Sequence, residues 1–280
     1  MSSQPAHLTK HIPQLQYNFN STPYSLAQLT DGVSNGTALW LGGQCLAMYL
    51  AQHHGKLFKS ESRTPRAIEL GSGIGLTALA LASLGWDVVA TDTPHVVTSV
   101  LKRNISTNLS TLPSGSGTVQ VRELDWLVPH EQWTWDNPSI IASSATLSEL
   151  TTSSPDLLRP PFDLIFTADT VYATELIEPM LRTLSTLSCP LSSSNVPPVL
   201  LCVERRDPRL VDRLLSDAKE KWGFTVERIP HRKVAKALEK SGTHWEKGDW
   251  EDVELWKLKL RPGAINTPKI STGNPNLKAN

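Results

Sequence analysis

Three glycines, Gly71, Gly73 and Gly75, lie within a short stretch that could bind a ligand through its backbone. The apolar run that ends at Leu70 is typical of a buried strand, and an apolar pattern with helical spacing begins at Leu76. Glycines at such a junction allow a tight turn, and they allow a ligand to approach the main chain at the N-terminus of the helix. The sequence therefore predicts a ligand-binding loop, with a simple strand-to-helix turn as the alternative.

The spacing of the glycines disfavours a dinucleotide. The G-x-G-x-x-G fingerprint needs a glycine where this chain has Leu76, and the chain has no Tyr-x-x-x-Lys or similar arrangement for hydride transfer. A nicotinamide oxidoreductase is therefore only a minor alternative. Asp92 ends the next predicted strand, about 20 residues beyond the loop, where a carboxylate can accept hydrogen bonds from both ribose hydroxyls. Asp92 thus predicts a nucleoside cofactor, unless it only caps a helix.

A second acidic residue follows another predicted strand. The apolar run at 162–167 leads into Ala168 and Asp169, and Tyr172 completes a D-x-x-Y pattern. A carboxylate at the end of a strand attracts and orients a cationic amine such as a lysine ammonium. The carboxylate of Asp169 therefore predicts recognition of a cationic amine.

These motifs resemble those of a known enzyme family. The stretch from Glu69 to Gly75 resembles the first motif of the seven-stranded S-adenosylmethionine-dependent methyltransferases. Enzymes that methylate amide and adenine nitrogens have Asn-Pro-Pro-Tyr at this position, which this chain lacks. Asp169 and Tyr172 instead match the D-x-x-Y motif of protein-lysine methyltransferases that modify chaperones and translation factors. The resemblance spans about residues 36–260. Within the family, the chain looks most like the fungal enzymes that methylate a lysine of elongation factor 1-alpha.

The resemblance implies the cofactor S-adenosyl-L-methionine and a role for each motif residue. Trp126 would form an apolar wall for the adenine and Trp40 would offer an electron-rich face to the sulfonium, although either ring could instead be a packed core aromatic. Asp169 and Tyr172 would be the catalytic residues that face the incoming lysine. The implied cofactor contacts are Trp40, Glu69, Gly71, Ser72, Gly73, Asp92, Trp126 and Ala168.

The order of the predicted elements favours an α/β fold. Apolar strands at 67–70, 87–91, 119–124, 162–167, 199–204, 224–229 and 253–260 alternate with helical patterns at 38–53, 76–84, 96–104, 175–187 and 208–222. We expect a Rossmann-like seven-stranded methyltransferase sheet, mostly parallel, whose final strand is antiparallel. No helix is expected between the last two strands.

Composition indicates three parts of the chain and several surface loops. Residues 1–35 are expected to form an N-terminal extension and residues 36–260 the methyltransferase domain. The Ser-, Thr- and Pro-rich stretches 137–161 and 188–198 predict surface insertions within that domain. Residues 261–280 are rich in Pro, Gly, Asn and Lys and predict a disordered tail.

Charge and cysteine content exclude several classes of function. The 27 basic residues balance the 27 acidic residues, so a nucleic acid is not expected as a direct partner. No secretory signal or membrane span is evident, which predicts a cytoplasmic protein. The three cysteines lack metal spacing, and no metal is expected. We expect a monomer that modifies a protein, elongation factor 1-alpha above all. Another protein, a small molecule or an RNA as substrate, or a non-catalytic binding role, are the alternatives.

Overall fold

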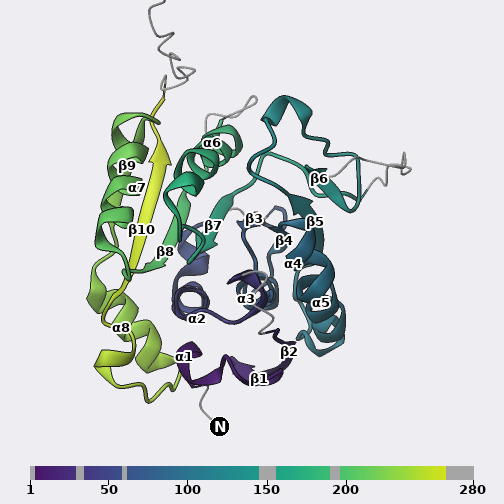
Figure 1. Cartoon of the computed structure of the whole chain (residues 1–280). Helices are drawn as coiled ribbons and strands as arrows, with labels where there is room; N and C mark the ends of the chain where they lie inside the picture. Colours follow the sequence, from purple (N-terminus) through teal and green to yellow (C-terminus); the bar gives the residue numbers. More distant parts are fainter. Residues whose placement is uncertain (1–3, 30–34, 59–61, 145–155, 190–195, 263–280) are drawn as a thin grey trace, which may run out of the picture.

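One mixed β-sheet organises the molecule. The computed structural model describes residues 4–29, 35–58, 62–144, 156–189 and 196–262. Within them, eight strands form the sheet in the order β6-β5-β4-β3-β7-β8-β10-β9 (Figure 1). Neighbouring strands are parallel, except that β10 is antiparallel to both β8 and β9. The strands are β3 (Arg66–Leu70), β4 (Asp87–Asp92), β5 (Val119–Leu124), β6 (Ile140–Ala142), β7 (Leu164–Ala168), β8 (Val199–Glu204), β9 (Phe224–Arg228) and β10 (Val253–Leu260).

Helices cover both faces of the sheet. Figure 1 shows α2 and α3 on one side and α6 on the other. Because both faces are covered, consecutive strand residues point into different cores: Leu164 and Phe166 join one buried cluster, and Ile165 joins the other. The helices are α1 (Ala6–Thr9), α2 (Leu41–His53), α3 (Leu76–Ser83), α4 (Pro94–Val96), α5 (Lys102–Asn108), α6 (Ile177–Ser188), α7 (Pro208–Glu220) and α8 (His231–Lys240), with a π-helical turn at Val97–Leu101 between α4 and α5.

The predicted α/β fold is confirmed, with one strand more than expected. All seven predicted strands form, within a few residues of the predicted bounds. The additional strand β6 lies in the stretch 137–161, which the sequence predicted to be a loop. Ile140 and Ala142 pair with β5 in parallel, and Ile141 is buried. A strand of three residues is too short to show a periodic pattern, which explains why it escaped prediction.

The absence of a helix between the last two strands was a wrong prediction. Helix α8 begins at His231, the first residue of the basic run 231–236, and its buried residues are Val234, Ala237 and Leu238. This spacing places the three side chains on one face of the helix, which packs against α2. The signal was weak because only these few apolar residues interrupt a charged stretch. The predicted antiparallel pairing of the final strands is confirmed, since β9 and β10 are antiparallel.

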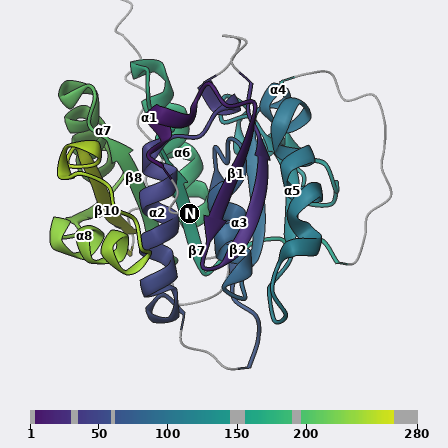
Figure 2. The ribbon, with the colours of Figure 1, turned by 90° about the horizontal axis from the view of Figure 1, so that it is seen from below.

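An N-terminal hairpin covers α3 and is held by α5. Strands β1 (Gln14–Phe19) and β2 (Thr22–Ala27) form the hairpin, which Figure 2 shows across α3, between α2 and α5. Asn104 in α5 accepts a hydrogen bond from the N–H of Ala27 (2.8 Å) and donates to its carbonyl (3.0 Å). Asn108 does the same for Ser25 (2.8 and 2.9 Å). The two asparagines therefore satisfy the outer edge of β2 as a neighbouring strand would.

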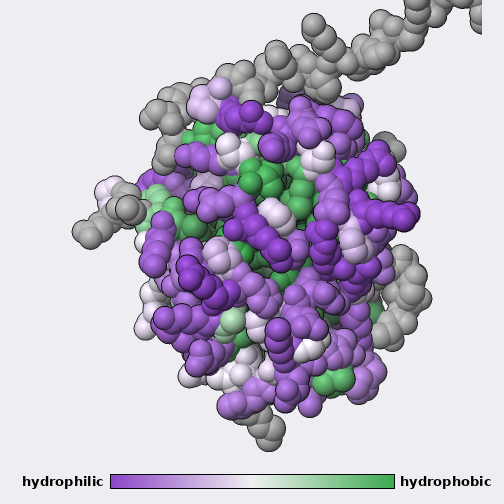
Figure 3. All heavy atoms as spheres, turned by 90° about the vertical axis from the view of Figure 1, so that its left-hand side faces the viewer, coloured by the Kyte–Doolittle hydropathy of each residue, from purple (hydrophilic) through white to green (hydrophobic). Residues whose placement is uncertain are grey.

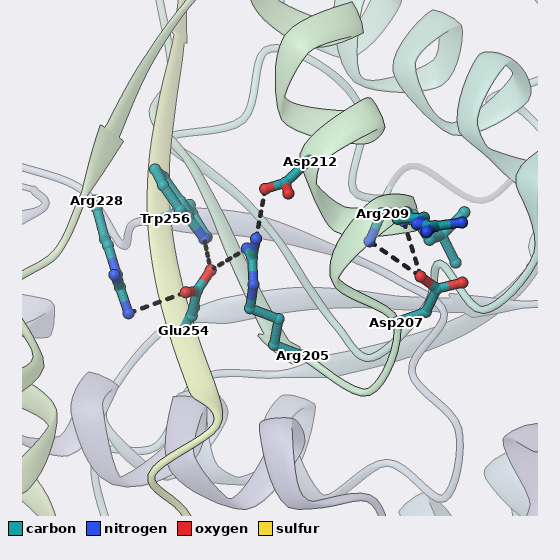
Figure 4. Close-up of polar contacts among 8 residues, drawn as sticks. Arg205, Asp207, Arg209, Asp212, Arg228, Glu254 and Trp256 are labelled. Atoms are coloured by element: carbon teal, nitrogen blue, oxygen red, sulfur yellow. Dashed lines mark hydrogen bonds and ion pairs between the residues drawn. The ribbon is translucent and has the colours of Figure 1, made fainter.

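A buried carboxylate joins the antiparallel end of the sheet to its surroundings. Glu254 in β10 accepts hydrogen bonds from Arg205 (3.1 Å) and from the indole N–H of Trp256 (3.1 Å), and it forms an ion pair with Arg228 at 2.9 Å (Figure 4). Arg205 also pairs with Asp212 of α7 at 2.5 Å. The surrounding face, over α7, α8 and β10, is mostly hydrophilic, with hydrophobic atoms gathered near its centre (Figure 3).

Several predictions concern residues outside the described ranges. Most of the predicted tail (263–280) lies there, as do the middle of the first insertion (145–155) and of the second (190–195). Their predicted loop or disordered state stays a prediction. The expected N-terminal extension, in contrast, contains α1 and the hairpin β1–β2.

Candidate functional site

The glycine loop between β3 and α3 has a backbone that only glycine adopts readily. Gly71, Gly73 and Gly75 all have positive φ angles, of 68°, 55° and 88°. A Cβ atom added at Gly71 would lie 2.3 Å from the methyl group of Thr170, so a larger residue cannot be accommodated there. The loop is tied to the neighbouring strand because the N–H of Ser72 donates to the carbonyl of Thr91 (2.8 Å).

Two acidic residues lie at this loop, as the sequence predicted. Asp92 at the end of β4 accepts hydrogen bonds from the N–H groups of Gly73 and Thr93, both at 2.8 Å. Burial raises the pKa of Asp92 to about 6, although these two N–H groups oppose the shift. Glu69 is buried below the loop, and burial raises its pKa well above the usual range. Both carboxylates are therefore less acidic than exposed ones would be.

Trp126 faces the same loop from the end of β5. Its ring atom Cη2 lies 3.7 Å from the position that a Cβ on Gly71 would take. Arg182 of α6 donates to the carbonyl of Trp126 (2.6 Å), which fixes this turn. Asp125, beside it, accepts a hydrogen bond from the N–H of Leu127 (2.9 Å) and so holds the same turn. The structure thus brings the predicted adenine wall next to the predicted cofactor loop.

Asp169 occupies an unusual position after β7. Its φ angle is +52°, in the left-handed region that non-glycine residues seldom adopt. One carboxylate oxygen accepts a hydrogen bond from the N–H of Gly42 (2.6 Å), and the other accepts one from the N–H of Glu204 (2.8 Å). Burial raises the pKa of Asp169, while the two amides and the charge of Arg206 oppose the increase. The carboxylate is therefore fixed between the start of α2 and the end of β8.

Ala168 and Tyr172, the neighbours of Asp169, lie at the same edge of the sheet. Ala168 is the last residue of β7 and is only partly buried. Tyr172 is one of the most exposed large hydrophobic side chains of the described chain, at 60% exposure. Partial burial, followed by the charges of Asp92 and Glu175, raises the pKa of Tyr172. The phenol therefore feels the charge of Asp92 at the glycine loop and is still accessible to solvent.

Trp40 contacts two cations of its own chain. The ammonium of Lys10 lies 3.2 Å from the centroid of its ring system, and the guanidinium of Arg206 lies 4.2 Å from it. The indole N–H donates to the carbonyl of Asn35 (2.6 Å). The ring thus offers its electron-rich face to cations, although the predicted contact of Trp40 with a sulfonium stays a prediction.

Sequence reasoning assigned no role to several residues of this site. Gly42 and the amide of Glu204 position Asp169, Thr170 packs on the glycine loop, and Arg206 and Lys10 contact Trp40. The position of Glu204 at the end of a predicted strand, where a parallel sheet collects its ligands, was an available signal. Nothing in the local sequence of Lys10 indicated that it lies close to residues so far along the chain.

The fold defines the class: an α/β protein with a Rossmann-like, mostly parallel sheet, in which the glycine loop, Asp92 and Trp126 lie together at the carboxyl ends of β3, β4 and β5. Residues 19–149 match the model of a protein family described as lysine methyltransferase. The chain is therefore similar to this family over the part that contains the glycine loop, Asp92 and Trp126.

Curated relatives have corresponding names. The chain is 30% identical to human methyltransferase-like protein 22 over 61% of this chain and 38% of that protein. It is 28% identical to the mouse protein N-lysine methyltransferase METTL21A over 78% of this chain and 82% of that protein. A solved structure, the CurJ carbon methyltransferase, is 14% identical, with a TM-score of 0.46 over 77% of this chain and 53% of that one. The chain spans 38–41% of the length of the human and mouse methyltransferase-like protein 22 that it matches.

Two further properties of the described residues concern other kinds of site. Among them, no helix is long and apolar enough to cross a membrane. No group of three or more His, Cys, Asp or Glu side chains in that same part of the chain could hold a metal ion.

Proposed function

We propose that this chain is a protein-lysine N-methyltransferase that acts on translation elongation factor 1-alpha, as a monomer in the cytoplasm. The observation that carries the proposal is the carboxylate of Asp169, held by two backbone amides at the edge of the sheet where the cofactor loop lies. An acid fixed in this way can orient a cationic amine without first having to be ordered itself. The family match and the names of the relatives support a lysine as the amine.

The cofactor is S-adenosyl-L-methionine, and the residues at the loop fit it. The glycines leave the backbone open to the ligand, Asp92 presents a carboxylate to the ribose hydroxyls, and Trp126 lies against the loop where the adenine would stack. Glu69 and Ser72 lie below and within the loop. When bound, the cofactor supplies an electrophilic methyl group on a sulfonium.

The proposed roles of Asp169 and Tyr172 concern the lysine. A free lysine has a pKa of about 10.4, so it arrives as an ammonium that must lose a proton before it can attack. Each oxygen of Asp169 accepts one backbone N–H and retains a second lone pair, with which it can accept a hydrogen bond from the ammonium. Asp169 would orient the amine while the proton leaves to solvent, and the exposed ring of Tyr172 would line the approach of the side chain.

Elongation factor 1-alpha as the substrate is supported by the resemblance of residues 36–260 to the fungal enzymes that modify it. Glu204 at the end of β8 donates its N–H to Asp169 at the oxygen that does not bind Gly42 of α2. The lysine to be methylated would enter between Tyr172 and the ends of α2 and β8 that bind Asp169.

Asp169→Asn separates catalysis from cofactor binding. An amide keeps the shape of the side chain but lacks the negative charge, and one of its two terminal atoms can no longer accept from a backbone N–H. We expect methyl transfer to be abolished, while the affinity for S-adenosylmethionine, measured by calorimetry, changes little. Asp136→Asn is the control, because it removes one negative charge from an exposed carboxylate that pairs with Arg159 and has no assigned role in the site, so transfer should stay intact.

The substrate is identified in the same assay. The wild-type chain and both variants are incubated with methyl-labelled S-adenosylmethionine, purified elongation factor 1-alpha and, separately, a fungal lysate. Label on a lysine of the elongation factor, absent with Asp169→Asn, supports the proposal. Label only on another protein or on a small molecule would contradict elongation factor 1-alpha as the substrate and identify the other molecule instead. Equal loss of cofactor binding and of methyl transfer in the variant would contradict the role of Asp169.

A further inference from the structure

A lysine of the chain itself lies at the candidate site. Lys10 follows the short helix α1, and its ammonium lies 3.2 Å from the centroid of the Trp40 ring system. Trp40 directly precedes α2, whose second residue, Gly42, donates its N–H to Asp169. Lys10 therefore contacts a segment, 40–42, whose last residue binds the carboxylate that we propose as the amine-orienting group.

The segment around Lys10 is fixed by hydrogen bonds to the same region. The side-chain amide of Gln28 donates to the carbonyls of Thr9 and Ile12, both at 2.9 Å, and its oxygen accepts from the N–H of Leu39 at 2.7 Å. One buried side chain thus connects the residues on both sides of Lys10 to the residue before Trp40. Gln44 of α2 adds a hydrogen bond to the carbonyl of Gln4 (2.9 Å).

The charges around Lys10 are those of the site. Burial and the positive charge of Arg206 lower the pKa of Lys10, while the carboxylates of Glu204 and Asp169 raise it. The lysine therefore lies in the field of Asp169 and has a larger neutral fraction than an exposed lysine. Its four-carbon stem is flexible, so its nitrogen can leave the ring and turn toward the carboxylate.

We propose that Lys10 is an intramolecular methyl acceptor of this chain. The inference rests on the proposed function. The neutral Lys10 nitrogen, its proton lost to solvent, would form a bond to the transferred methyl carbon as the sulfur–methyl bond breaks, and that electron pair would remain on sulfur. The methylated product keeps a positive charge and so keeps its attraction to the electron-rich face of Trp40, a type of contact that also binds methylated lysines.

The test needs only the full chain and methyl-labelled S-adenosylmethionine, with no other protein present. After incubation, the intact mass and a peptide map locate the label. We expect label on Lys10 that is lost in Lys10→Arg, which keeps a cation on Trp40, and in Asp169→Asn. Lys56→Arg is the matched control, because Lys56 is an exposed lysine beyond the opposite end of α2 and its replacement should leave the label unchanged. The fraction labelled in a given time should not depend on protein concentration.

Each outcome bears on the proposal in a defined way. Label on Lys10 with a concentration-independent rate supports it. A rate that rises with concentration, or label on other lysines only, would overturn it. If elongation factor 1-alpha is labelled in the parallel assay while Lys10 is not, the intramolecular step is refuted and the proposed function stands. If the cofactor binds but neither Lys10 nor any added protein is labelled, both proposals are refuted.

Discussion

At the scale of single residues, Asp169 explains most of the geometry of the site. A positive φ angle in a non-glycine residue costs free energy of order 1–3 kcal/mol, and the surrounding structure must compensate for it. Here the two amides that bind its carboxylate, from Gly42 and Glu204, provide this compensation. A Cβ on Gly42 would lie within 2.6–2.7 Å of the carboxylate, so the close approach also requires glycine at that position.

If Asp92 binds the cofactor as we propose, its raised pKa should make the affinity for S-adenosylmethionine depend on pH. If the ribose hydroxyls donate to the ionised carboxylate, affinity is complete above the pKa of about 6 and is lost as the pH falls through it. One pH unit below the pKa, about one chain in ten remains ionised, so the affinity should be about tenfold weaker. Calorimetric titration of S-adenosylmethionine across this range measures the effect.

Asp92→Asn supplies the comparison for that titration. The variant should bind weakly at all these pH values and show a flat profile, because position 92 no longer titrates. Glu69 is the other buried carboxylate at the loop and also has a raised pKa. An unchanged pH profile in the variant would assign the dependence to Glu69 and contradict the role of Asp92.

At the scale of elements, α5 holds both the N-terminal hairpin and the glycine loop in place through Asn104. Asn104 binds both backbone groups of Ala27, and its amide also donates to the carbonyl of Ile74 in the loop (3.0 Å). Asn104 and Asn108 each begin an Asn-x-Ser sequence, the pattern of a glycan acceptor, yet both side chains are buried and hydrogen-bonded. Both asparagine side chains therefore bind the hairpin backbone and do not face solvent.

Replacing Asn104 with Ala should destabilise the fold. The change leaves the N–H of Ala27 and the carbonyl of Ile74 without this partner in a buried place, and such groups cost about 1–3 kcal/mol each. We expect the free energy of unfolding in urea to decrease by about 2–4 kcal/mol. Ser106→Ala, on the exposed side of the same helix, should change it by no more than about 0.5 kcal/mol. Equal effects of the two substitutions would contradict this account.

At the scale of the whole molecule, the site lies where the carboxyl ends of parallel strands meet. Its outer boundary is the loop after β8, in which Arg205 and Arg206 contact different parts of the molecule. Arg206 pairs with Glu204 and contacts Trp40, while Arg205 pairs with Glu254 and with Asp212 of α7. The antiparallel end of the sheet is thereby linked to the residues around Asp169.

Glu254→Gln should weaken this link. Its side chain is 8% exposed and pairs with two arginines, one of which is half exposed, so the loss lies below that of a fully buried ion pair. We expect a decrease of about 1–3 kcal/mol in the free energy of unfolding. Asp212→Asn removes a pair whose carboxylate is 65% exposed and should cost at most about 1 kcal/mol. Chemical denaturation of both variants measures the difference, and a larger loss for Asp212→Asn would refute the ranking.

The sequence by itself determined the order of the elements and the chemistry of the strand ends. Apolar runs buried on both faces and the glycines at 71, 73 and 75 follow local patterns, which is why seven strands and the glycine loop between β3 and α3 could be predicted. The same patterns place the acidic residues Asp92 and Asp169 at strand ends. Only the tertiary structure decided which distant residues meet them. The contact of Lys10 with Trp40 joins segments far apart in the chain, as does the clamp of Gly42 and Glu204 on Asp169, and β6 and α8 gain their stability from packing. Such contacts depend on the three-dimensional arrangement of the sheet and its helices, which no local spacing of residues encodes.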